Sequence, residues 1–109
     1  MEARYIQVQT ATPSKDDAER IARALVERQL AACVQVVGPV SSTYRWRGSV
    51  ETAEEWLCIA KTEARLFVAV SAAITELHPY ETPEIVATPI IEGSPEYLEW
   101  ISDSVSNGA

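Results

Sequence analysis

The sequence predicts an α+β fold whose elements follow the order β-α-β-β-α-β-α. Three observations predict it. Some segments alternate apolar and polar residues, some repeat apolar residues at helical spacing, and two neighbouring strands are joined by a tight turn. The chain has 109 residues, which is close to the commonest domain size, and its composition shows no internal boundary. Residues 1–109 are therefore expected to form one domain.

The first strand and the first helix are indicated by their periodicity. Residues Tyr5 to Ala11 alternate, with Ile6 and Gln7 on opposite faces, as in a strand with one buried face. Ser14 is a suitable N-cap for the helix that follows. Apolar residues recur there every three or four positions, which predicts a helix to about Leu30.

A long hairpin is expected next. The β-branched segment Cys33 to Val37 predicts a strand, and Gly38-Pro39 predicts a bulge or bend because proline cannot donate to the ladder. The strand resumes at about Val40 and continues to Arg47. A tight turn at Gly48-Ser49 then leads into a strand from Val50 to about Lys61.

The remaining segments complete the fold. A second helix is predicted from about Glu63 to Leu77, and a strand from Glu84 to Ile91 whose Pro89 belongs at an edge or a bulge. Gly93-Ser94-Pro95-Glu96 predicts the start of a final helix, with a cap and Pro at the first position, that leads into Tyr97 to Val105. Ser106 to Ala109 is expected to fray. This order contains the split βαβ arrangement of a ferredoxin-like sandwich, with a C-terminal helix added. Two helices should cover one face of a four-stranded antiparallel sheet.

The central hairpin is too long for its own domain. Twelve strand residues reach about 40 Å, whereas a 15-residue helix covers only about 22 Å. The tip should overhang the core, with Tyr44 and Trp46 on one face and Arg45 and Arg47 on the other. Exposed strand edges and aromatic side chains favour pairing with another chain over a solvent-exposed flap. A cyclic homotrimer is a natural closed assembly.

Composition excludes several classes of partner. The net charge of −7 argues against nucleic-acid binding, which needs Lys and Arg to replace counterions on phosphate. The sequence contains no long apolar run and no apolar stretch at its start, so we expect a cytoplasmic protein with no membrane segment. Its two cysteines, Cys33 and Cys58, are expected to be free thiols there.

Few side chains support catalysis. His78 is the only histidine, so a single chain has no histidine pair for zinc, and no nucleophile motif accompanies it. The four glycines form neither a Walker loop nor a dinucleotide-binding motif. Cys58 lies in an apolar segment and is expected to be a small buried core residue. The sequence therefore predicts a protein that is not an enzyme.

The densest polar cluster is the proline-braced segment from His78 to Glu84. An imidazole beside carboxylates, such as that of Glu81, can ligate a divalent cation, and copper is first in the affinity order. Cys33 is a further candidate ligand, or a packed thiol. Alternatively, His78 caps the second helix by bonding its last carbonyls. Lys61 is expected either to pair with Glu81 or Glu84 at a subunit cleft or to be solvated.

Four stretches resemble the CutA divalent-cation tolerance proteins. They are Leu30-Ala31-Ala32-Cys33-Val34, Tyr44-Arg45-Trp46-Arg47-Gly48, Lys61-Thr62 and His78-Pro79-Tyr80-Glu81-Thr82-Pro83-Glu84-Ile85. The ending from Gly93 to Trp100 resembles the same family. The match runs in order from about Val8 to Ile101.

The resemblance implies a ferredoxin-like fold, a homotrimer similar to that of PII signalling proteins, and a role in tolerance of copper or another divalent cation. It implies no enzymatic activity. His78 matches a proposed copper ligand, whereas Leu77 and Thr10 stand where some members have a histidine and a cysteine. The residues matching positions that line the inter-subunit clefts are Tyr44, Trp46, Lys61, Tyr80, Glu81 and Glu84.

Two functions from different classes follow. The first is a trimeric, metal-responsive protein with weak sites built from His78, Glu81 and Cys33. The second is a PII-like sensor whose cleft binds a small anionic metabolite through Lys61 or the hairpin arginines, against Tyr44 or Trp46. A scaffold for a partner protein and a hydrolase are weaker alternatives.

Overall fold

The computed structural model describes residues 3–106. Most of the end expected to fray, Asn107 to Ala109, therefore lies outside the described residues. The elements are β1 (Tyr5–Thr12), α1 (Lys15–Glu27), β2 (Cys33–Trp46), β3 (Ser49–Glu63), the 3-10 turn η1 (Ala64–Leu66), α2 (Phe67–Leu77), β4 (Val86–Ile90) and α3 (Pro95–Ser104).

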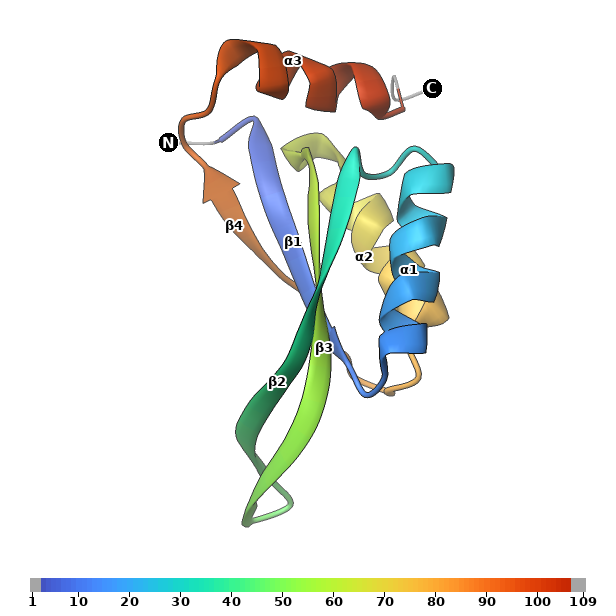
Figure 1. The fold of residues 1–109 in the computed structure, drawn as a ribbon, viewed down its shortest axis with the longest axis vertical. Coiled ribbons are helices and arrows are strands. Elements are labelled where there is room, and N and C mark those ends of the chain that lie inside the picture. Colours follow the sequence, from blue (N-terminus) through green and yellow to red (C-terminus); the bar gives the residue numbers. More distant parts are fainter. Residues whose placement is uncertain (1–2, 107–109) are drawn as a thin grey trace.

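The four strands form one antiparallel sheet in the order β2-β3-β1-β4. Helices α1 and α2 cover one face, and α3 lies across the end of the sheet away from the hairpin tip (Figure 1). This confirms the predicted ferredoxin-like fold with a C-terminal helix and a long hairpin. Pro89 lies on β4, an edge strand, as expected from its missing N–H. Among residues 3–106, no helix combines the length and the apolar character needed to span a membrane.

The core fills the space between the sheet and the two covering helices. Val8 of β1, Ile21 and Leu25 of α1, and Val70 and Ile74 of α2 are almost completely buried. Burying each such side chain stabilises the fold by about 1.5–3 kcal/mol. The helical apolar spacing that predicted α1 and α2 is therefore the spacing of their core contacts.

Helix α1 ends at Glu27, earlier than the expected end near Leu30. Ser14 caps its start as predicted, because its hydroxyl accepts a hydrogen bond from the Asp17 N–H at 3.1 Å. At the other end, Gln29 has a φ of 58°, in the left-handed region. The N–H of Leu30 then bonds back to the Leu25 carbonyl at 2.9 Å, which closes the helix.

The second helix begins four residues later than expected, at Phe67. Glu63 is still extended and belongs to β3, and the Ala64 N–H donates to the Arg4 carbonyl at 2.7 Å. This long-range bond continues the sheet, and the 3-10 turn η1 follows before α2 starts. Periodicity alone could not locate this boundary, because the contact that sets it joins residues 60 positions apart.

The hairpin extends beyond the body of the molecule, as predicted (Figure 1). Residues 56–63 of β3 pair with β1, whereas residues 49–55 pair with β2 alone. The turn is Arg47-Gly48 and not Gly48-Ser49, since Trp46 pairs with Ser49. Arg47 and Gly48 both have positive φ, 50° and 82°, which a two-residue hairpin turn of this twist requires.

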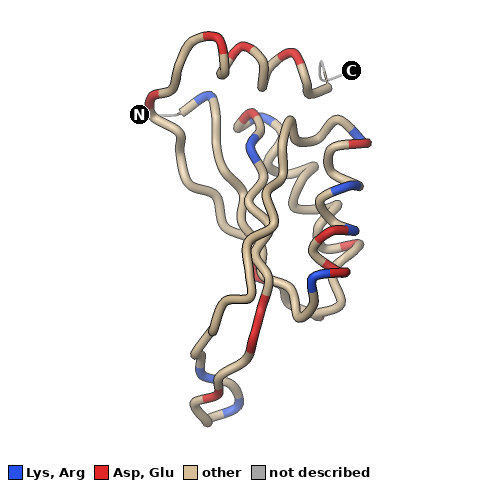
Figure 2. Tube along the Cα trace, viewed as in Figure 1, with Lys and Arg blue, Asp and Glu red and all other residues tan. Residues whose placement is uncertain are grey.

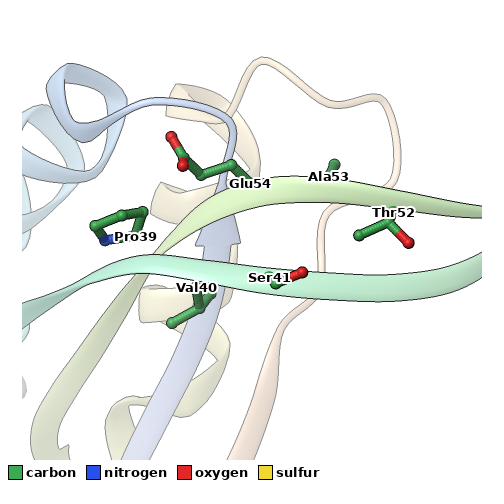
Figure 3. A pocket seen from close by; sticks show the side chains of 6 residues that line it. All are labelled: Pro39, Val40, Ser41, Thr52, Ala53 and Glu54. Atoms are coloured by element: carbon green, nitrogen blue, oxygen red, sulfur yellow. The ribbon is translucent and has the colours of Figure 1, made fainter.

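A β-bulge interrupts β2 at Gly38-Pro39, as expected. Val37 pairs with Leu57 and Val40 with Glu55, so β2 has one residue more than β3 across this interval. Beyond the bulge, the hairpin carries a pocket of about 270 Å³. Figure 3 shows its lining residues, which are Pro39, Val40, Ser41, Thr52, Ala53 and Glu54.

Candidate functional site

His78 is buried at the end of α2, with only 7% of its surface exposed. Its backbone N–H donates to the Ile74 carbonyl at 2.8 Å, but its ring does not bond the helix carbonyls. The ring reaches across to β1, where Nε2 lies 2.8 Å from the Ala11 carbonyl oxygen. Because a carbonyl only accepts, Nε2 carries the proton. His78 therefore caps the last turn of α2, as the alternative expected, but it does so through its backbone N–H, while its ring bonds β1.

The other ring nitrogen of His78 is also engaged. Nδ1 accepts a hydrogen bond from the Tyr80 N–H at 3.0 Å. The neutral imidazole thus uses its one donor and its one acceptor inside the chain, and it holds the start of the proline-rich segment against β1. A metal ion can bind His78 only after one of these two hydrogen bonds breaks.

Tyr80 connects this segment to the hairpin. Its ring centre lies 4.8 Å from that of His78, and its hydroxyl donates to Glu55 Oε2 at 3.0 Å. Burial, followed by the hydrogen bond to the Glu55 carboxylate, raises the pKa of Tyr80 to about 12. Glu55 is the last of the β3 residues that pair with β2 alone, next to the point where β1 joins the sheet. Tyr80 therefore ties the candidate metal segment to the base of the overhang.

The three candidate metal ligands do not converge within one chain. Cys33 pairs with Lys61, which is level with Gln7 on β1, whereas His78 contacts Ala11. Four strand residues separate these levels, which corresponds to about 13 Å along the sheet between the level of Cys33 and the level that the His78 ring contacts. Glu81 is exposed. In residues 3–106 no three His, Cys, Asp or Glu side chains are grouped so that they could hold a metal ion.

The candidate cleft residues occupy two separate regions. Lys61 contacts its own sheet: Nζ donates to Gln35 Oε1 at 3.2 Å and lies 5.8 Å from the ring centre of Tyr97. Glu84 accepts a hydrogen bond from Gln9 Nε2 at 2.9 Å. Within a single chain, Lys61 therefore has a polar partner other than the acids weighed from the sequence.

The hairpin aromatics are the other group. Tyr44 is 40% exposed and Trp46 is 54% exposed. The Arg47 guanidinium lies 5.3 Å from the centre of the Trp46 ring. Both rings stay exposed because they lie on the part of the hairpin that extends beyond β1.

Sequence reasoning missed several partners in this region. The sequence did not indicate Glu55 or Ala11, because the Glu55 carboxylate and the Ala11 backbone carbonyl are reached by the Tyr80 and His78 side chains from a segment distant in sequence. Thr10, at the position of a family cysteine, is completely buried and its hydroxyl lacks a hydrogen-bond partner in the described part of the chain. A neutral hydroxyl is a poor copper ligand.

The fold and these residues agree with a known family. Residues 6–104 match the family model described as CutA1 divalent ion tolerance protein. The chain belongs to this family. It is 47% identical over 92 residues to the divalent-cation tolerance protein CutA of Thermus thermophilus, covering 84% of this chain and 89% of that one. It is 41% identical over 98 residues to protein CutA of Mus musculus, covering 87% of this chain and 55% of that one.

A solved structure agrees over nearly the whole molecule. The CutA1 protein of the psychrotrophic bacterium Shewanella sp. SIB1 superposes with a TM-score of 0.95 at 38% identity, covering 98% of this chain and 100% of that one. The CutA1 resemblance inferred from the sequence motifs is confirmed, and the chain is a member of a divalent-cation tolerance family whose relatives are named for tolerance and not for a reaction.

Proposed function

We propose that this CutA1-family chain forms a homotrimer that binds Cu²⁺, or another divalent cation, weakly and without catalysis. The family is named for divalent-cation tolerance, which supports a divalent cation as the ligand. An imidazole, a thiolate and a carboxylate suit copper among such cations. The proposed ligands are His78, Cys33 and Glu81, in a cytoplasmic protein whose two cysteines are free thiols.

The overhanging hairpin is the observation that carries the proposal. It presents uncovered aromatic rings, and its strands lack a third strand beside them between residues 49 and 55 of β3. Such a hairpin is marginally stable in water unless another surface covers it. Neighbouring chains in a closed ring provide that surface, with Tyr44, Trp46, Lys61, Tyr80 and Glu84 at the clefts between them. Ligands that lie apart in one chain can then come together from two.

The hydrogen bonds of His78 account for weak binding. The bond from the Tyr80 N–H to Nδ1 is the one that can break, because Tyr80 lies at the surface and water can replace the ring as acceptor. Its loss costs about 0.5–1.5 kcal/mol, which reduces the affinity about two- to tenfold. Nδ1 would then be the metal-binding nitrogen, while Nε2–H stays on the Ala11 carbonyl.

The first expected result concerns assembly. Light scattering after gel filtration should give about 36 kDa, three times the 12.0 kDa mass of one chain. Replacing Tyr44 and Trp46 together with serine should shift the protein toward smaller species, because the buried apolar area of the contact falls. Val68→Ser, at an exposed position on α2, is the matched control and should remain a trimer. A wild-type protein that stays monomeric at every concentration contradicts the proposed assembly.

The second expected result concerns the metal. Calorimetric titration with CuCl₂ should show binding to the wild type and at least tenfold weaker binding to His78→Gln, whose amide can still donate and accept hydrogen bonds. Cys33→Ser and Glu81→Gln should weaken binding as well. Glu19→Gln removes an exposed acid on α1 and should change nothing. Equal binding by wild type and His78→Gln, or no binding by the wild type, contradicts the proposed site.

A second function is favoured by the basic groups of the hairpin. Arg47 lies over the Trp46 ring, and Arg45 is also exposed near the tip. Together with Lys61 of a neighbouring chain, these groups would suit a small anionic metabolite in a PII-like sensor. The copper titration separates the two functions. Weaker copper binding by His78→Gln supports the metal-binding function, whereas a metabolite sensor of this kind does not require His78 to bind metal.

A further inference from the structure

A charged cluster lies at the end of the sheet opposite the hairpin tip, away from the candidate metal segment. Figure 2 shows basic and acidic positions close together at this end. At its centre is Glu63, the last residue of β3, which is only 4% exposed. Arg4 precedes β1 and Arg65 belongs to η1, while Ser102 reaches the cluster from α3.

Both carboxylate oxygens of Glu63 accept hydrogen bonds. Arg65 Nε donates to Oε1 at 2.8 Å, and Arg4 Nε donates to Oε2 at 3.2 Å. Ser102 Oγ also donates to Oε2, at 2.7 Å. Two guanidinium groups are therefore held on the two sides of one carboxylate.

The two arginines have binding capacity left. Arg4 uses a second nitrogen for Ser102 at 3.4 Å, and Arg65 Nη2 donates to the Ser106 carbonyl. Each guanidinium has five N–H donors, so most of them remain available for another acceptor. Two positive charges face one negative charge, which leaves a net charge of about +1 in a chain whose total is −7.

A pocket opens beside these groups. It has a volume of about 270 Å³ and is lined by Arg4, Glu63, Ala64 and Arg65. The side chains of Arg4 and Arg65 are 71% and 42% exposed, so a solute can reach both. The volume suits a phosphate or a small carboxylate and is below the usual range for nucleotide-sized ligands.

We propose that this pocket is a binding site for a small oxyanion, a phosphate or a carboxylate, held between the guanidinium groups of Arg4 and Arg65. The planar fork of arginine matches two oxygens of such a group. Glu63 fixes both arginines before the anion arrives, so little side-chain entropy is lost on binding. The site shares no residue with the proposed copper site.

The test uses arginine side-chain NMR signals of the full chain at constant ionic strength. Inorganic phosphate and succinate are titrated separately, with sodium chloride as the reference salt. The Nε–H signals of Arg4 and Arg65 should shift saturably with at least one of the two anions. The anion that produces the shift identifies the group bound.

Variants make the result specific. Arg4→Gln removes an exposed side chain and should weaken binding at least tenfold, and Arg65→Lys should weaken it too because the fork is lost. Arg23→Gln, in the exposed Arg23–Glu27 pair of α1, removes the same charge and should leave binding unchanged. No saturable shift with either anion, or an equal affinity in Arg4→Gln, overturns the proposal.

Discussion

Replacing His78 with alanine is expected to lower the free energy of unfolding by about 2–4 kcal/mol in the absence of any metal. The change removes the partner of the buried Ala11 carbonyl and of the Tyr80 N–H. Each unmade hydrogen bond costs about 1–3 kcal/mol when the remaining group is buried, and less when water can reach it. The space left by the ring adds a cavity term. Urea unfolding in EDTA at one fixed protein concentration measures the loss.

Two variants separate this structural role from metal binding. His78→Gln should recover part of the lost stability, since an amide can donate to Ala11 and accept from Tyr80. Glu81→Ala, at an exposed position of the same segment, should change stability by less than about 0.5 kcal/mol. A His78→Ala protein as stable as Glu81→Ala would show that the two ring hydrogen bonds contribute nothing.

Glu63→Gln is expected to lower the free energy of unfolding by about 1–3 kcal/mol at pH 7. The amide keeps the shape of the side chain but loses the charge that binds Arg4 and Arg65. Because both arginine side chains are partly exposed, solvent screens the ion pairs and reduces the loss of stability. Burial by itself would raise the pKa of Glu63, but the hydrogen bonds from Ser102 and Arg65 and the nearby positive charges lower it.

The lowered pKa of Glu63 gives this effect a definite pH dependence. An unfolded glutamate has a pKa of about 4.3. The stabilisation by Glu63 is complete above that value and disappears as the pH falls through its lower pKa in the folded protein. The stability difference between wild type and Glu63→Gln should therefore be constant near neutrality and shrink below about pH 4. Glu27→Gln, in the exposed pair with Arg23, is the control and should show little difference at any pH. A Glu63→Gln difference that persists unchanged down to about pH 3 contradicts this origin.

Local patterns were sufficient to predict most of the fold. Pro39 located the bulge because a missing N–H has only a few tolerated places in a sheet. Strand and helix periods located the core and the overlong hairpin. Of the two boundary errors, one depends on a distant contact and the other on a local backbone conformation. Glu63 is extended because β3 continues to the level of Arg4, and α1 ends early because Gln29 turns left-handed.

The candidate site was predictable in composition but not in geometry. The sequence indicated that His78 and the residues after it form a stiff polar segment. It could not indicate that one ring nitrogen of His78 bonds the carbonyl of Ala11, 67 positions away, or that the other accepts a hydrogen bond from the Tyr80 N–H. Nor could it show that Cys33 lies level with Lys61 and apart from His78. Such facts depend on strand register, which a single sequence constrains only loosely.

The bulge at Gly38-Pro39 changes which residues of β2, odd-numbered or even-numbered, face the helices. Before it, Val36 shares a side of the sheet with Cys58, toward the helices; after it, Tyr44 shares a side with Glu51, away from them. Across this one extra residue, the even-numbered side chains of β2 change sides. Beyond the bulge they lie on the side that α1 and α2 leave open, and they include Tyr44 and Trp46. Shortening the hairpin by one residue pair near its tip would only reduce its reach. Removing one residue at the bulge would instead restore an uninterrupted ladder: β3 and the turn would still hold Tyr44 opposite Glu51 and Trp46 opposite Ser49, so the aromatic rings would keep their side and the local bend would be lost.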